Sequence, residues 1–206
     1  MAAAVGPIIF VIVVVGGITR LTESGLSIVE WQPLAGALPP LSQADWEALF
    51  AKYQATPQYQ KVFSEIGLEG FKRIFWWEYA HRLLGRVIGL VFLLPYLFFL
   101  FKGKLDKSLS WTLAGLFVLG ALQGAMGWFM VKSGLTIRTD VSQYRLAAHL
   151  ALALVVYSLA VWTAAELLGF RYRNAEAPED GAGARLRRRT GWFAGFVFLT
   201  IVSGAF

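Results

Sequence analysis

Long apolar runs separated by polar segments dominate this chain. The longest runs lie at residues 2–19, 79–101, 110–131 and 143–168. A helix needs about 20 mostly apolar residues to cross a bilayer. Inside the hydrocarbon only helices and closed barrels satisfy their own backbone hydrogen bonds. The pattern therefore predicts an all-α polytopic membrane protein in which residues 1–168 form a four-helix transmembrane bundle. A signal peptide is the alternative for residues 2–19, but neither a basic leader nor a small-residue cleavage site accompanies that run.

The connection at residues 20–77 is polar and aromatic, and a structureless segment of this length would be unusual. Ser42 and Asp45 have the spacing of a capping box, and an apolar stripe with helical spacing follows them. The stripe consists of Trp46, Leu49, Phe50 and Tyr53. Residues 68–77 look like a helical lead-in to the second membrane helix. The sequence therefore predicts a partly helical outer loop that forms a lid on the membrane surface.

The end of the chain combines a polar segment with a fifth apolar run. Residues 169–190 form an arginine-rich linker, and its acidic middle at residues 174–184 has the composition of a flexible segment. The fifth apolar run occupies residues 191–206. We expect this run to be the truncated start of transmembrane helix 5, in a second half that this sequence lacks.

Composition narrows the chemistry further. The chain is 57% hydrophobic and contains no cysteine and only two histidines. Disulfides, thiolate metal sites, cysteine nucleophiles and a three-histidine metal site are therefore excluded within this sequence. The net charge of +6 indicates topology rather than nucleic-acid binding, because Lys and Arg gather in cytoplasmic loops of membrane proteins.

The basic residues orient the helices. Residues 102–107 and 171–189 are rich in Lys and Arg, which places both segments in the cytoplasm and the segments 20–77 and 132–142 outside. His81 begins the second membrane helix at its outer end, and His149 lies about two turns into the fourth. Both histidines are thus predicted at similar depth near the outer face, which in a bacterial inner membrane is the periplasmic face.

Two histidines at matched depth favour a heme between them, because bis-imidazole ligation needs little more from a protein than a slot and hydrogen-bond partners. Glu78 shares a helix face with His81 and is the candidate catalytic carboxylate. Gly85 and Gly89 follow on roughly the same face and leave room for a flat group. Each histidine could instead be structural, and Glu78 could simply pair with Arg82 four residues later.

Further polar groups are candidate pocket contacts. Arg82, Arg86 and Arg145 could bind heme propionates, because a guanidinium can bind both oxygens of a carboxylate, or they could be boundary anchors. Gln123 is the one strongly polar residue in the middle of the third membrane helix. The same helix carries Gly120, Gly124 and Gly127, which we expect on close-packing faces.

Four motifs in this chain resemble those of the heme A synthase family, in the branch found in mitochondria and alphaproteobacteria. They are GGITRLTESGLS at residues 16–27, EYAHRLLGR at 78–86, QGAMGWFMVKSGL at 123–135 and VSQYRLAAHL at 141–150. The resemblance covers nearly all of the chain except residues 174–190. The absence of cysteine fits this branch, since the other bacterial branch carries a cysteine pair in its first outer loop.

The resemblance implies an eight-helix pseudo-symmetric fold, of which this chain would be the first half. It implies oxidation of the C8 methyl group of heme O to a formyl group, giving heme A for cytochrome c oxidase, with water as the oxygen source. It assigns Glu78 as the essential carboxylate and His81 and His149 as ligands of the substrate heme O. A heme b cofactor is expected in the missing half. Besides the lipid bilayer, candidate partners are heme O synthase, cytochrome oxidase assembly factors and a second copy of the chain.

Two other functions remain open at this stage. A bis-histidine electron-transfer cytochrome shares the paired imidazoles but does not need a carboxylate beside a ligand. A transporter is disfavoured because the sequence has no broken helices and no charged residues in the middle of the membrane runs. Pigment extraction separates the three functions, since heme A or a partly oxidised heme O indicates the enzyme, heme B alone indicates the cytochrome, and no heme indicates the transporter.

The charge asymmetry gives a testable topology. Reporter fusions at residues 105 and 180 are expected to score as cytoplasmic, and fusions at residues 55 and 137 as periplasmic. A periplasmic signal at residue 105 would invert the orientation and put both histidines at the cytoplasmic side.

Overall fold

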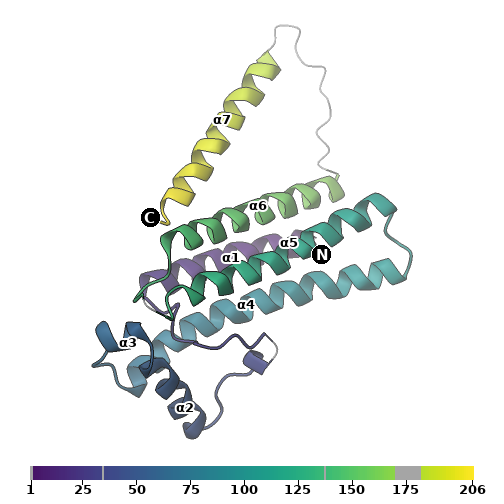
Figure 1. Cartoon of the computed structure of the whole chain (residues 1–206). Helices are drawn as coiled ribbons and strands as arrows, with labels where there is room; N and C mark the ends of the chain where they lie inside the picture. Colours follow the sequence, from purple (N-terminus) through teal and green to yellow (C-terminus); the bar gives the residue numbers. More distant parts are fainter. Residues whose placement is uncertain (1, 34, 137, 170–181) are drawn as a thin grey trace.

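A computed structural model describes residues 2–33, 35–136, 138–169 and 182–206, and the described part is helical throughout its regular structure (Figure 1). The elements in chain order are α1 (Ala2–Leu21), the short 3-10 helix η1 (Ala35–Ala37), α2 (Gln43–Gln54), α3 (Pro57–Lys61), α4 (Leu68–Phe101), α5 (Lys107–Lys132), α6 (Gln143–Leu167) and α7 (Ala182–Ser203). The all-α prediction is confirmed.

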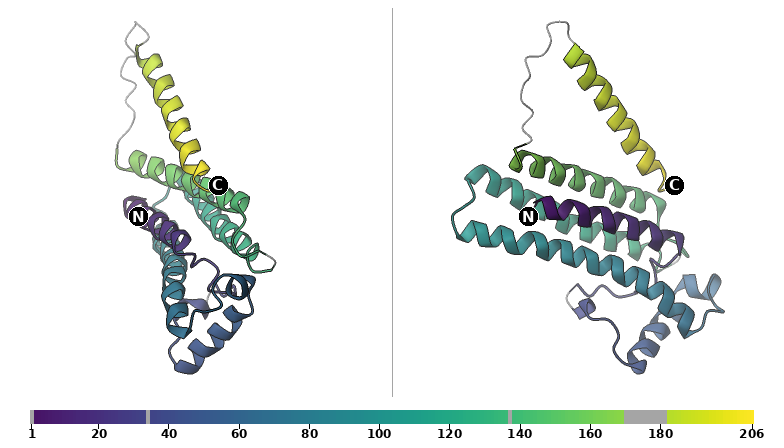
Figure 2. Two further views of the ribbon diagram at one scale, coloured as in Figure 1. Left: turned by 90° about the vertical axis from the view of Figure 1, so that its left-hand side faces the viewer. Right: turned by 180° about the vertical axis from the view of Figure 1, so that it is seen from behind.

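Four of these helices form a bundle. α1 packs against α4 and α6, and α5 packs against the same two helices. α4 and α6 therefore occupy one diagonal of the bundle, and α1 and α5 occupy the other (Figure 2). Within the described residues α4, α5 and α6 are long and apolar enough to cross a membrane, while α1 contributes a shorter apolar helix over Gly6–Leu21.

The lid is an aromatic subdomain at one end of the bundle (Figure 1). Ser42 and Asp45 form the predicted capping box at the start of α2. The lead-in at residues 68–77 is not a separate element, because α4 runs unbroken from Leu68 to Phe101 and includes Pro95. The core of the lid consists of Tyr53, Phe71, Phe75 and Tyr79. Packing of α2 onto the first turns of α4 thus holds the lid at this end of the bundle.

The apolar core of the bundle lies toward the opposite end. Its buried members come from the beginning of α1 and α5 and from the later turns of α4 and α6; they are Ile9, Phe92, Tyr96, Leu113, Leu116 and Ala160. The histidines lie on the lid side of this cluster. The predicted site therefore lies nearer the lid than the apolar core cluster does.

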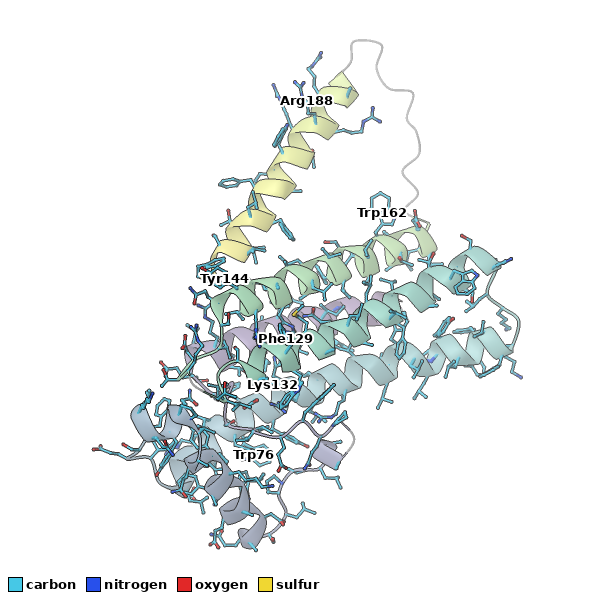
Figure 3. All side chains as sticks on the ribbon, viewed as in Figure 1. Trp76, Phe129, Lys132, Tyr144, Trp162 and Arg188 are labelled. Carbon is cyan, nitrogen blue, oxygen red and sulfur yellow. The ribbon has the colours of Figure 1, made fainter. Side chains whose placement is uncertain are left out.

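Two expectations about helices need correction. The fifth helix begins at Ala182 rather than at residue 191, and so includes the arginines of the predicted linker; residues 170–181 of that linker lie outside the described part. α7 meets the bundle near Tyr144, which contacts Phe206, whereas Arg188 lies far from it (Figure 3). Of the three glycines expected to pack closely on α5, only Gly127 does so, because an added methyl group at Gly120 or Gly124 would meet nothing within 4 Å.

Candidate functional site

The two histidines lie on the α4–α6 diagonal of the bundle. His81 comes from α4 and His149 from α6. The Nδ1 atom of each imidazole is buried and has no hydrogen-bond partner among the described residues. The two predicted ligands thus come from helices that are not neighbours in the bundle, and each has a buried Nδ1 atom inside it.

Each imidazole rests on a glycine of the adjacent helix. A Cβ atom added at Gly16 of α1 would lie 2.8 Å from Cε1 and 3.2 Å from Nδ1 of His81. A Cβ atom added at Gly127 of α5 would lie 3.0 Å from Cε1 of His149. Both distances are shorter than a carbon–carbon contact at optimal separation, about 3.5–4.0 Å. A side chain at Gly16 would therefore require the ring of His81 to shift, and one at Gly127 would crowd the ring of His149.

Gln123 completes the polar lining. Its side-chain amide donates to the His149 carbonyl at 3.0 Å and lies 3.4 Å from Nε2 of the same residue. An amide N–H near Nε2 is compatible with the tautomer that carries its proton on Nδ1 and leaves the Nε2 lone pair open. This is the form of imidazole that binds a metal through Nε2.

Three buried side-chain polar atoms in the described part of the chain have no hydrogen-bond partner. They are Nδ1 of His81, Nδ1 of His149 and Oε1 of Gln123. Buried polar groups are almost always hydrogen-bonded, and an exception needs an explanation such as a ligand. Because all three belong to residues of one site, the geometry indicates a place where a polar or metal-containing group binds.

Glu78 differs from these three residues, because both oxygens of its carboxylate have hydrogen-bond partners. The residue is only 3% exposed. Oε2 accepts from the Ser27 hydroxyl at 2.7 Å and from the Ile28 backbone N–H at 2.8 Å. Oε1 accepts from Nε and Nη2 of Arg82 at 3.0 and 2.6 Å. The predicted pairing with Arg82 therefore exists, but it is buried and joins α4 to the first outer loop rather than lying on a helix surface.

The arginines bind backbone carbonyls. Arg82 also donates to the carbonyls of Ile28 and Glu30. Arg86 donates to the carbonyls of Gln32 and Pro33 at 2.9 and 2.8 Å. Together with Glu78 they form a latch that fixes the loop segment 27–33 over α4.

Arg145 lies in a different setting, at the start of α6. It donates to the Phe129 carbonyl at 2.7 Å, and its guanidinium stacks over the ring of that residue, 3.7 Å from the centroid. All three arginines thus donate to backbone carbonyls in this structure. Propionate binding by any of them remains a prediction and requires an exchange of these contacts.

The predicted glycines on α4 differ from those on α1 and α5. A methyl group at Gly85 would touch only Ile12, at 3.8 Å, and one at Gly89 would meet nothing within 4 Å. Both positions are therefore open, which is compatible with room beside α4.

A cavity of about 360 Å³ lies under the lid, next to the latch. Its walls include apolar residues of the outer loop and of α2, and Arg82 and Arg86 on α4. Trp31 at the loop stacks on Trp128 of α5, with ring centroids 5.7 Å apart, and closes the loop over the bundle. The outer loop and α2 thus cover the end of the bundle that carries Arg82 and Arg86.

The sequence interpretation missed several residues of this site. Ser27 and Ile28 hold Glu78, and Gly16 and Gly127 support the histidines. The motif similarity does carry a signal for these residues, because the motifs at residues 16–27 and 123–135 contain Gly16, Ser27 and Gly127. Which glycine of the pair Gly16 and Gly17 faces an imidazole depends on the rotation of α1 about its axis, and spacing does not give that rotation.

The described residues contain no cluster of three or more His, Cys, Asp or Glu side chains able to hold a bare metal ion. A metal bound by two imidazoles must therefore bring its remaining ligands with it, as an iron porphyrin does. These features define a polytopic helical membrane protein with two buried imidazoles inside a four-helix bundle. The chain belongs to the COX15-CtaA family, described as cytochrome oxidase assembly protein, which matches residues 2–206.

Curated relatives agree with this assignment. The chain is 54% identical over 200 residues to a protein named heme A synthase from Nitrosospira multiformis, covering 97% of this chain and 55% of the relative. It is 52% identical over 198 residues to one from Rhodospirillum centenum, covering 96% and 52%. The chain spans about half the length of the curated relatives it matches. No solved structure gives a significant match.

The latch predicts a stability effect of Ser27→Ala. The change removes one of four donors to a buried carboxylate, and a hydrogen bond to a charged group contributes about 1.5–3 kcal/mol. Unfolding of the detergent-solubilised chain should show a loss of that size. Ser158→Ala on α6 is the control, because its exposed hydroxyl only bonds the Leu154 carbonyl of its own helix. Equal stability of the two variants would mean that the latch contributes nothing to folding.

Proposed function

We propose that this chain is the substrate-binding half of a heme A synthase and holds heme O between His81 and His149. The observation that carries the proposal is the pair of imidazoles inside the bundle whose buried Nδ1 atoms lack partners. The names of the curated relatives support it. His81 and His149 would hold the heme iron through their imidazole nitrogens.

The proposed reaction converts the C8 methyl group of heme O and one water into a formyl group, four protons and four electrons. The electrons leave through a heme b cofactor in the other half, which supplies the redox chemistry when bound. The residues of this chain hold the substrate and set the charge around it. His81 and His149 fix the iron, so that the C8 edge is held at one place relative to α4.

Glu78 acts in this proposal as a fixed negative charge rather than as a mobile base. Its oxygens accept four hydrogen bonds, two of them from the cationic Arg82. Such a carboxylate is held in one position by its partners. It lies one helical turn from His81, where it can offset positive charge that develops on the substrate during oxidation. Proton acceptance by Glu78 would first require release of the latch.

An electron-transfer cytochrome is the second candidate. The observation that favours it is the same latch, because a structural role in fixing the loop at residues 27–33 accounts for Glu78 without any catalysis. The two candidates differ in whether removing the charge of Glu78 stops product formation or only weakens the lid.

The remaining proposals concern the setting. We place the protein in the inner membrane of a bacterium, with the heme site near the periplasmic face. Segments predicted on the same side of the membrane do lie together, because Leu26 of the first loop packs against Gly134 of the α5–α6 connection. Heme O synthase and oxidase assembly factors are proposed partners that would deliver heme O and receive heme A, and a homo-oligomer is a further proposed arrangement.

The ligand assignment predicts that His81→Ala and His149→Ala each abolish the low-spin bis-histidine spectrum of the heme-loaded chain. Neither variant has another imidazole to replace the lost ligand, because the chain contains only two histidines. The measurement is the reduced-minus-oxidised spectrum after purification. Leu122→Ala, at an exposed position of α5, is the control for membrane insertion and yield. An unchanged spectrum in either histidine variant would refute the heme site.

The role of Glu78 is tested in a full-length chimera, in which this chain replaces the matching part of a curated relative. Glu78→Gln keeps the size of the side chain and removes its charge. Loss of a single preorganised electrostatic group lowers rates by about 10²–10³-fold, so extracted pigment should contain heme O and little heme A. Glu69→Gln makes the same chemical change on the same helix, where the side chain is 81% exposed, and should leave heme A formation normal.

The result also separates the two candidate functions. Normal heme A from Glu78→Gln would reduce Glu78 to a structural latch. Heme B alone in the unmodified chimera would favour the cytochrome. Because Glu78→Gln also disturbs the latch, Ser27→Ala in the same chimera measures how much of the loss comes from the lid alone.

A further inference from the structure

The surroundings of the two histidines repeat one arrangement. His81 on α4 packs against Gly16 of the preceding bundle helix α1, and His149 on α6 packs against Gly127 of the preceding helix α5. In each case the backbone of the residue four positions before the glycine also reaches the imidazole. That residue is Ile12 for His81 and Gln123 for His149. The ligands thus occupy one diagonal of the bundle and their glycines occupy the other.

The spacing of four has a physical reason. In an α-helix the side chain of a residue points back toward the N-terminus and covers the turn that precedes it. Glycine leaves that turn bare, so the carbonyl four residues earlier is accessible from the side. A carbonyl oxygen has two lone pairs, and the helical N–H uses only one of them. The other can accept a hydrogen bond from a neighbouring helix.

We propose that the carbonyl oxygens of Ile12 and Gln123 accept the Nδ1–H of His81 and His149 when heme is bound, and that Gly16 and Gly127 are positioning residues that expose these carbonyls. The inference rests on the proposed function, because it concerns the ligands of the bound heme. It gives each buried Nδ1 atom the partner it lacks. The bond requires each ring to reorient, since neither Nδ1 meets hydrogen-bond geometry in the present ring positions.

The consequence is control of the tautomer. A proton held on Nδ1 by a carbonyl leaves the Nε2 lone pair for the iron, orients the ring and raises the basicity of the ligand. Because the arrangement occurs on both sides of the site, both ligands are oriented by rigid helix backbone rather than by a side chain. The two axial bonds are thereby matched in strength and direction.

The first test needs no heme. Gly16→Ala puts a methyl group against the ring of His81, so the apo chain should unfold at a lower temperature than the unmodified chain. In a His81→Ala background the ring is gone, and the same glycine change should have no further effect. This double-mutant cycle isolates the glycine–imidazole contact. The cycle with Gly127→Ala and His149→Ala should behave alike.

Two matched controls lie beside these glycines. Gly17→Ala and Gly124→Ala add the same methyl group on the same helices, where nothing lies within 4 Å. They should leave the melting temperature and heme binding unchanged. An equal loss for Gly16→Ala with and without His81 would show that the glycine faces something other than the imidazole, and would overturn the inference.

The second test uses ferric heme B as the probe, because it presents the same iron and porphyrin ring. Removal of a partner that orients a metal-bound histidine typically lowers affinity 10–100-fold. Gly16→Ala and Gly127→Ala should each lose that much heme affinity and should shift part of the bound heme to the high-spin state. Their midpoint potentials should rise, since a less basic imidazole stabilises ferric iron less.

The outcomes distinguish a failure of the proposed function from a failure of the positioning role of Gly16 and Gly127. If the unmodified chain binds no heme in a bis-histidine form, the proposed function fails. If the unmodified chain binds heme normally and the glycine variants match their controls in affinity, spin state and potential, only the positioning role of Gly16 and Gly127 fails.

Discussion

The structure depends on one constraint, which is that the interior of a membrane bundle offers no water to satisfy polar atoms. Glu78 meets that constraint through Ser27, Ile28 and Arg82, with four hydrogen bonds on two oxygens. The two imidazoles do not meet it, because each Nδ1 remains without a partner. Glu78 therefore stabilises the fold by itself, whereas the two imidazoles leave Nδ1 atoms that a ligand-bound state could satisfy. The site also lies away from the apolar core cluster of the bundle, where interlocked side chains would leave no room for a porphyrin.

The latch around Glu78 links the outer loop to the site. Arg82 and Arg86 hold the loop through four backbone carbonyls, and the carboxylate of Glu78 holds Arg82. Buried ion pairs are worth little when compared with apolar packing, but breaking one by removing a single partner is strongly destabilising, by about 3–5 kcal/mol. The same carboxylate can therefore fix the lid and supply a negative charge next to His81. These two roles are compatible, because both need a carboxylate held in a fixed position.

Much of this architecture was predictable, and the reasons for the rest are specific. Apolar length gave the four bundle helices, the Ser42–Asp45 spacing gave the start of α2, and Lys and Arg placement put both histidines toward one end. Each of these signals can be read from neighbouring residues or from a count of residues in one segment, without knowledge of the packed structure. The arginine contacts with loop carbonyls were not predictable, because a carbonyl is present at every residue and carries no sequence signal. The choice of Gly127 over Gly124, and of Gly16 over Gly17, depends on helix rotation, which only the packed bundle sets.

The two sides of the site are alike in backbone and different in side chain. Ile12 and Gln123 occupy equivalent places four residues before their glycines, yet only Gln123 carries a polar side chain. Its amide lies 3.4 Å from Nε2 of His149, on the atom that would bind iron. If His149 binds iron as proposed, ligation would exchange this amide contact for a metal bond, whereas Ile12 carries no amide to make the same contact with His81. An amide N–H close to Nε2 lowers the penalty of leaving that nitrogen without a partner when the site is empty. The two predicted ligands therefore differ in how well the protein alone satisfies them.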